Sequence, residues 1–178
     1  MFKIIPVVMM LVWTAFSGLT AWSATAPGPP DAPGSQFNSR GEKIGELRLN
    51  LPEKAVIRNI PCRPKKSKEI FEAATGEYVQ MWKYAECGIV LKMSSDHKGG
   101  AKAVASIIVS GPCKLVTSRG IHIGSTESEV IRAYGRYGDQ EGNTVKGKRF
   151  VAGSIYDGMV FDFKGGRVVG IFLGAGAE

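Results

Sequence analysis

The chain has few of the residues that metal binding and nucleophilic catalysis use most. Its 178 residues include two histidines and three cysteines. His97 follows Asp96 in a polar stretch, and His122 lies between two isoleucines without a second ligand two or four positions away. Neither histidine has a spacing to a cysteine or a carboxylate that suggests a catalytic triad. We therefore expect a protein that is not an enzyme and uses no metal and no cofactor.

A phosphate-binding loop and an excess of acidic residues are also missing. The glycine-rich stretches at 165–166 and 170–176 lack the spacing and the Lys-Ser/Thr ending of such a loop, and predict a hairpin turn and a frayed C-terminus. Basic residues outnumber acidic ones by 23 to 16, for a formal charge of +7, which favours attraction to anions. Because the N-terminus predicts export, those anions are envelope components, and nucleic acid is not expected as a partner.

The N-terminus has the order of a secretory signal. Lys3 precedes an apolar run at 4–16, and small residues follow at 21–24. We expect residues 1–24 to be a signal peptide, which makes the protein periplasmic or secreted. The alternative is a retained membrane anchor, which places the folded part on the same side of the membrane. Residues 25–41, rich in proline and glycine, are expected to form a disordered linker.

Two stretches of the remaining chain repeat one another at an offset of 74 residues. Residues 47–60 and 121–134 both contain the triplet Val-Ile-Arg, at 56–58 and at 130–132. Repeats of this kind usually mean that each copy is a supersecondary unit that buries its apolar face against its own sheet or against its twin. The pattern therefore indicates a duplicated small unit rather than one large enzyme fold.

Each copy predicts one short helix near its start. In the first copy the helix begins at Pro52, which suits a first helical position, and Pro61 stops it. In the second copy Thr126 and Glu129 have the spacing of a capping box, and Gly135 suits a left-handed exit. Residues 46–51 predict a short strand or an extended segment before the first helix, and the alanine-rich stretch 69–74 predicts a second short helix after it.

Three strands follow the helix in each copy. Alternating and apolar stretches separated by turns predict them at 78–84, 89–93 and 103–109 in the first copy, and at 150–156, 159–163 and 167–173 in the second. The expected fold class is α+β. It consists of two tandem repeats, residues 42–115 and 116–178, each a short helix followed by an antiparallel three-stranded meander.

The second copy also carries a motif with a family resemblance. Residues 119–130 read Arg-Gly-Ile-His-Ile-Gly-Ser-Thr-Glu-Ser-Glu-Val, and an aromatic-glycine pair follows at 134–135. With the tandem helix-and-meander pattern, this resembles the β-lactamase inhibitor protein fold and is similar to the small outer-membrane-assembly lipoproteins that share it. The first copy has Asn50 in place of Gly124, and a lipobox cysteine is missing. The resemblance implies a protein that binds other proteins or envelope components.

An oxidising compartment is expected to join two of the three cysteines. In a meander the start of the second strand lies beside the end of the third, so the turn that contains Cys87 is expected near Cys113. We favour a disulfide between Cys87 and Cys113, and a bridge that uses Cys62 is the alternative. Cys62 is not expected to be a nucleophile, because a helix C-terminus does not favour a thiolate.

Three aromatic residues lie on one face of a predicted strand: Tyr78, Trp82 and Tyr84. They form either part of the core or an exposed aromatic binding face. The connectors at 63–76 and 136–149 are basic, and form either ordinary solvated loops or a rim that attracts anions. The residues predicted to bind a partner are Tyr78, Trp82 and Tyr84 for contact, and Lys65, Lys66, Lys146, Lys148 and Arg149 for steering.

The function that these features favour is an exported, non-catalytic protein-binding or envelope-assembly module. Its expected partner is a protein of the cell envelope, with weak contact to anionic envelope surfaces through the basic connectors. The alternative is an inhibitor or immunity-type protein that blocks a specific envelope or secreted enzyme.

Overall fold

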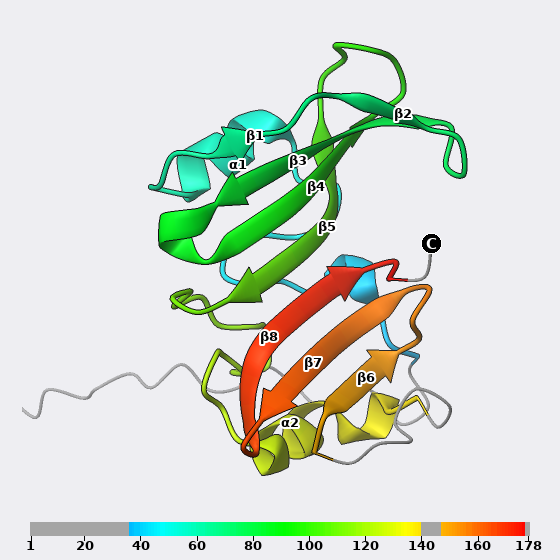
Figure 1. Cartoon of the computed structure of the whole chain (residues 1–178). Coiled ribbons are helices and arrows are strands. Elements are labelled where there is room, and N and C mark those ends of the chain that lie inside the picture. Colours follow the sequence, from blue (N-terminus) through cyan, green and yellow to red (C-terminus); the bar gives the residue numbers. More distant parts are fainter. Residues whose placement is uncertain (1–35, 140–146, 177–178) are drawn as a thin grey trace, which may run out of the picture. The chain divides into compact units, whose positions relative to one another are not determined.

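An antiparallel sheet of eight strands organises the part of the chain that the computed structural model describes, residues 36–139 and 147–176. The strand order is β1-β3-β4-β5-β8-β7-β6, and β2 pairs with the same edge of β3 as β1 does (Figure 1). The fold class is α+β. The strands are β1 (Lys65–Lys66), β2 (Ile70–Glu72), β3 (Glu77–Tyr84), β4 (Ile89–Ser95), β5 (Ala103–Ser110), β6 (Arg149–Gly153), β7 (Gly158–Lys164) and β8 (Arg167–Gly174). The helices are α1 (Glu53–Asn59) and α2 (Glu127–Tyr134), with short 3-10 helices η1 (Ser39–Gly41), η2 (Ala85–Cys87) and η3 (Gly135–Tyr137).

The expected signal peptide, residues 1–24, lies outside the described residues, and so does most of the expected linker at 25–41. The last residues of that linker belong to the folded part, because Ser39 is buried and the ring of Phe37 lies 5.7 Å from that of Tyr137. Within the described ranges, no helix has both the length and the apolar composition needed to cross a membrane.

The two helices begin and end largely as their sequences predict. The capping box of α2 is present: the backbone N–H of Thr126 donates to the Glu129 carboxylate at 2.6 Å, and the Glu129 N–H donates to the Thr126 hydroxyl at 3.3 Å. The predicted left-handed exit at Gly135 is wrong, because Gly135 has a right-handed conformation with φ −55°. The chain continues there into η3, which places Tyr137 in the core.

Two local predictions fail because pairing partners distant in sequence decide the conformation. The predicted helix at 69–74 is instead strand β2, in which Ile70 pairs with Val79 of β3. Of the two alternatives for 46–51, the strand does not form, and Leu47 forms only an isolated bridge with Ile44. Alanine-rich composition is a weak prior, and an available strand edge overrides it here.

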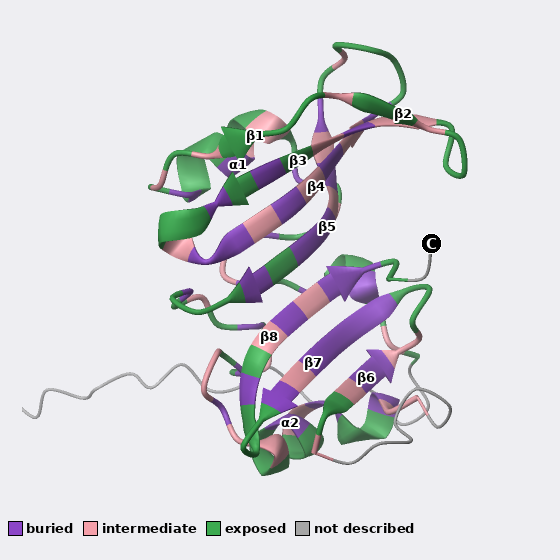
Figure 2. Cartoon of the chain, viewed as in Figure 1, coloured by how far each residue is buried: buried purple, intermediate pink, exposed green. Residues whose placement is uncertain are grey.

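The core lies between the helices and one face of the sheet. Along β3, Trp82 and Tyr84 are buried on this side, whereas Met81 and Lys83 are exposed on the other. Figure 2 shows the same alternation of burial along the neighbouring strands. Each fully buried Leu, Phe or Val side chain contributes about 1.5–3 kcal/mol to folding. Other members of this core are Val56, Val130, Tyr134, Leu91, Ile107, Phe161 and Leu173.

A buried carboxylate ties the start of the folded chain to its second half. Glu42, near the N-terminal end, accepts hydrogen bonds from Arg119 Nε at 2.9 Å, from the Tyr134 hydroxyl at 3.3 Å and from the Ser118 hydroxyl. Burial, and then the charge of Glu42, raises the pKa of Tyr134. In this network Tyr134 keeps its hydroxyl proton and donates it in a hydrogen bond to Glu42, and Arg119 is paired with the same carboxylate.

Two loop segments form the same hydrogen bonds with the parts of β5 and β8 that lie outside the β5–β8 pairing. The N–H of Asn50 donates to the carbonyl oxygen of Val104 at 2.8 Å, and the N–H of Gly124 donates to that of Val168 at 2.8 Å. Both donors have positive φ, 60° for Asn50 and 99° for Gly124, a region that glycine and asparagine tolerate best. Each segment then leads directly into a helix, α1 or α2.

Candidate functional site

The sheet has a second face, opposite the helices, which we call the open face. Figure 1 shows α1 and α2 on the far side of the strands, so neither helix of the described residues covers this face. Because side chains alternate along a strand, the open face receives the residues that lie between the core positions. Met81 of β3 and Ile108 of β5 are on it, each with 39% of its surface exposed.

A continuous row of apolar side chains crosses the open face from strand to strand. We call Val90, Ile108, Phe172, Val160 and Val151 the apolar row, because each lies directly opposite the next in the strand register. Ile108 is exposed and Val90 and Phe172 are partly exposed, whereas Val160 and Val151 are buried. The accessible part of the row is therefore the section on β4, β5 and β8.

Two lysines extend this row towards the edge of the sheet. Lys83 of β3 lies opposite Val90, and Lys65 of β1 lies opposite Lys83. Both lysines are exposed. Within the described part of the chain neither forms an ion pair. Like charges directly opposite one another on antiparallel strands are destabilising, so this pair is an unfavourable feature that the folded chain tolerates.

A groove of about 400 Å³ lies on the open face beside the apolar row. It runs between β2 and the residues that follow β8, and Phe172 belongs both to its wall and to the row. One ion pair, Lys92 Nζ to Glu72 Oε1 at 2.9 Å, lies among its apolar side chains. The groove is lined by Ser67, Ile70, Glu72, Val79, Met81, Lys92, Ser106, Phe172, Ala175 and Gly176.

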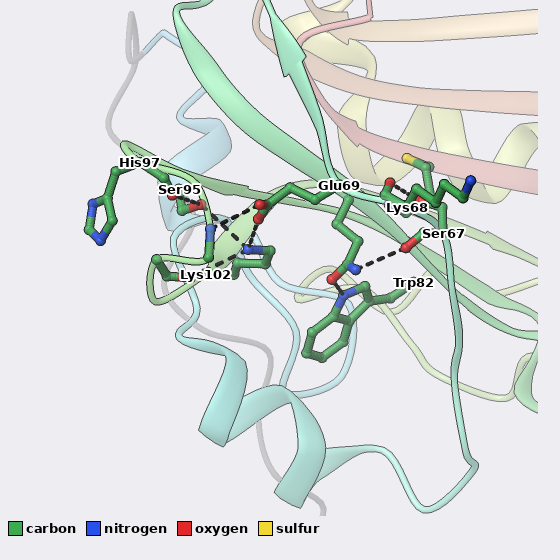
Figure 3. A network of polar contacts seen from close by, with 11 residues as sticks. Ser67, Lys68, Glu69, Trp82, Ser95, His97 and Lys102 are labelled. Carbon is green, nitrogen blue, oxygen red and sulfur yellow. Dashed lines mark hydrogen bonds and ion pairs between the residues drawn. The ribbon is translucent and has the colours of Figure 1, made fainter.

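The β2 wall of the groove is held in place by a second polar network. Glu69, just before β2, accepts hydrogen bonds from Lys102 Nζ and, at 2.9 Å, from the backbone N–H of Gly99 (Figure 3). These two hydrogen bonds, that from Lys102 first, lower the pKa of Glu69. Lys102 is buried and also donates to the Gly100 carbonyl oxygen at 3.4 Å. The network thereby joins β2 to the loop between β4 and β5.

The aromatic residues predicted for contact belong mainly to the core. Trp82 and Tyr84 are 0% and 1% exposed, so the hypothesis that they form a displayed binding face is wrong. Lys66 Nζ lies 3.5 Å from the centre of the Trp82 ring, on the core side of β3. Tyr78 is half-buried, and its ring lies 5.2 Å from that of Phe71. Burial raises the pKa of Tyr84, as expected for a core tyrosine.

The basic residues predicted for steering do not form one rim. Lys65 is at the β1 edge of the sheet, whereas Lys148 and Arg149 are at the β6 edge, the opposite end of the strand order. Arg149 is paired with Asp162, Nε to Oδ1 at 2.7 Å. Lys146 lies outside the described residues. Of the described members of this set, only Lys65 lies on the open face next to the exposed part of the apolar row.

The disulfide joins Cys62 to Cys87, with Cα atoms 6.2 Å apart, so the predicted bridge between Cys87 and Cys113 is wrong. The expected closeness of the two segments is present, because a Cβ atom at Gly88 would lie 2.7 Å from the backbone nitrogen of Cys113. The Cys87 side chain is nevertheless bonded to the segment after α1. Cys113 is free and buried, and burial raises the pKa of its thiol, which therefore stays protonated at neutral pH.

Sequence reasoning missed Ile108 and Phe172, the exposed and the partly exposed member of the apolar row that face one another across β5 and β8. A signal for them was present, because Ile107 and Ile108 are adjacent apolar residues in one strand, as are Ile171 and Phe172. Such pairs place apolar groups on both faces of a sheet. Which of the two faces the helices leave open depends on the tertiary packing.

Among the described residues, no group of three or more His, Cys, Asp and Glu side chains is arranged to hold a metal ion. The open face combines accessible apolar side chains with a groove, which makes it the candidate binding surface. No protein-family model, no curated protein and no solved structure matches this chain.

Proposed function

We propose that this chain is an exported, non-catalytic module that binds a protein partner through the open face of its sheet. The observation that carries this proposal is the accessible part of the apolar row, Val90, Ile108 and Phe172, on a face that neither helix of the described residues covers. Clustered exposed apolar side chains mark interaction surfaces on monomeric proteins. The adjacent groove gives the same face a concave region in which a partner side chain is desolvated.

Two features support the exported location. The first 24 residues have the charged, apolar and small-residue order of a secretory signal. The described part of the chain contains the disulfide between Cys62 and Cys87, and structural disulfides persist mainly in the periplasm and outside the cell. The proposed partner is accordingly a protein of the cell envelope or of the extracellular space.

We also infer that the folded part is a tandem duplication. The equivalent hydrogen bonds at β5 and β8 support it: the donors Asn50 and Gly124 are separated by the same 74 residues as the sequence repeat. Their acceptors, Val104 and Val168, are 64 residues apart, as are the matching strands. Each helix is followed by an antiparallel three-stranded meander, β3-β4-β5 or β6-β7-β8, which supports the same conclusion, although the short edge strands β1 and β2 precede the first meander.

The register between β5 and β8 supports a two-fold relation between the copies. Ile108 lies opposite Phe172, and these residues are equivalent at the offset of 64. Ile107 lies opposite Leu173, which is the equivalent of Val109. A local two-fold axis that passes between Ile108 and Phe172 would relate each residue of β5 to its equivalent in β8, and the observed pairing has this symmetry. Such a pair of units is what the resemblance to β-lactamase inhibitor proteins implies, and the open face is centred where the units meet.

The proposal is tested by affinity capture from an envelope extract with the exported chain and two variants. Ile108→Glu places a charge at the centre of the open face, and Ile131→Glu places the same charge on α2, where Ile131 is 51% exposed. We expect Ile108→Glu to reduce partner recovery at least about tenfold, the effect of about 1.4 kcal/mol, and Ile131→Glu to leave it unchanged.

Thermal unfolding of both variants verifies that they are folded. Equal recovery by the two variants, or no captured protein with the unaltered chain, would contradict the proposal. Capture of one enzyme in a one-to-one complex that suppresses its activity would identify the module as an inhibitor.

A further inference from the structure

We infer that the partner segment is acidic as well as apolar: its apolar side chain contacts Ile108, and its carboxylate binds between Lys65 and Lys83. This inference rests on the proposed function, because it assigns a chemical class to what the open face binds.

The side chains of both lysines belong to the open face. Lys83 lies between Trp82 and Tyr84 along β3, and because both of these are buried in the core, Lys83 points to the other side. Lys65 is directly opposite Lys83 and therefore shares its face. The next residue, Lys66, lies over the Trp82 ring at 3.5 Å, which places it on the core side, as alternation requires.

The neighbouring carboxylates do not neutralise this pair. Glu72 is bound to Lys92 at 2.9 Å, and Asp162 is bound to Arg149 at 2.7 Å on the far edge of the sheet. Glu77 shares a face of β3 with Lys83 but lies six positions away, about 20 Å along the strand. Among the described residues, Lys65 and Lys83 are thus a like-charge pair without an ion-pair partner, at the end of an exposed apolar row. A carboxylate that binds between them replaces repulsion by attraction.

The strand spacing sets the shape of the partner segment. Lys83 is two strands from Ile108 and Lys65 is three, which corresponds to about 10 and 14 Å across the sheet. An extended chain covers this distance in about three or four residues. The proposed segment therefore has an Asp or Glu three or four positions from its apolar anchor. The apolar contact supplies affinity, whereas the charge fixes register and accelerates association.

The experiment is a selection of 12-residue random peptides on the purified exported chain, followed by affinity measurements on the selected peptides. The test variant is Lys65→Gln/Lys83→Gln. The matched control is Lys54→Gln/Lys114→Gln, which removes the same charge from two exposed lysines elsewhere. We expect peptides with a carboxylate three or four positions from an apolar residue, binding at least about tenfold more weakly to the test variant. Affinity for the control variant is expected to be unchanged, and affinity for the unaltered chain to fall with added salt.

The possible outcomes separate this inference from the proposed function. Peptides that bind the test variant equally well but lose affinity for Ile108→Glu overturn the acidic partner and leave the binding face in place. Peptides that bind Ile108→Glu equally well, or a selection that yields no peptide, count against both. Lysine-dependent binding of phosphatidylglycerol vesicles without binding of acidic peptides overturns the inference in favour of a membrane surface.

Discussion

At the scale of single residues, alternation along one strand decides which side chains are available for binding. Trp82 and Tyr84 have the composition of an interaction hot spot, yet both are buried against the helices. Met81 and Lys83 occupy the intervening positions and are exposed. A period of two places residues on a common face, but only the position of the helices determines which face becomes core. The same argument separates Lys65, on the open face, from its neighbour Lys66.

Glu69 carries a pH-dependent part of the stability. Its pKa in the folded protein is lowered, first by the hydrogen bond from Lys102 and then by that from Gly99. A depressed pKa stabilises the folded state above the unfolded pKa of about 4.3, and this contribution is lost as pH falls through the lower folded value. We expect Glu69→Gln, which resembles the protonated form, to lower the free energy of unfolding at pH 7.

The expected difference between Glu69→Gln and the unaltered chain therefore disappears at acidic pH. Urea unfolding of both proteins at pH 7 and at pH about 3 measures it, since denaturant midpoints report changes in stability. Glu86→Gln is the matched control, because Glu86 is exposed in η2 and its carboxylate is outside this network. The prediction fails if the difference between Glu69→Gln and the unaltered chain is the same at both pH values.

At the scale of elements, the sequence predicts what local interactions control. The six strands of the two meanders and both helices form within a few residues of their expected positions. Alternation, prolines and a capping box are all local signals. Strand β2 and the disulfide partner of Cys87 depend on contacts between segments distant in sequence, so composition and spacing do not determine them. The open face likewise depends on contacts between distant segments, because the packing of the helices decides which face of the sheet stays uncovered.

The capping box of α2 gives a prediction at this scale. Thr126 accepts a hydrogen bond from the N–H of Glu129 and thereby satisfies one of the unpaired donors of the first turn. We expect Thr126→Ala to lower the free energy of unfolding by about 1 kcal/mol. Ser128→Ala, at an exposed position of the same turn, is expected to change it by less than about 0.5 kcal/mol. Equal effects of the two substitutions in urea unfolding would contradict this role.

At the scale of the whole folded part, the two proposed repeats are interlocked rather than independent. Glu42, in the first, is buried among groups of the second, where it is bound by Arg119 at 2.9 Å and by Tyr134 at 3.3 Å. The N–H of Gly45 also donates to the carbonyl oxygen of Val116 at 2.8 Å. The continuous sheet and the accessible part of the apolar row both exist only when β5 pairs with β8. The proposed binding through the open face therefore requires the joined pair.

This interdependence predicts the behaviour of the separated halves. Residues 36–115 and 116–178 are each short enough to be marginal as single domains, and each would expose a strand edge and part of the core. We expect neither fragment alone to show a cooperative thermal transition by circular dichroism, and an equimolar mixture to regain one. The shared Glu42 network supplies a matched control, because an Arg119→Ala second fragment leaves the Glu42 carboxylate without its cation and should weaken the reconstituted complex. Cooperative unfolding of either fragment by itself would show that the repeats are independent domains, and the open face would then need a different origin.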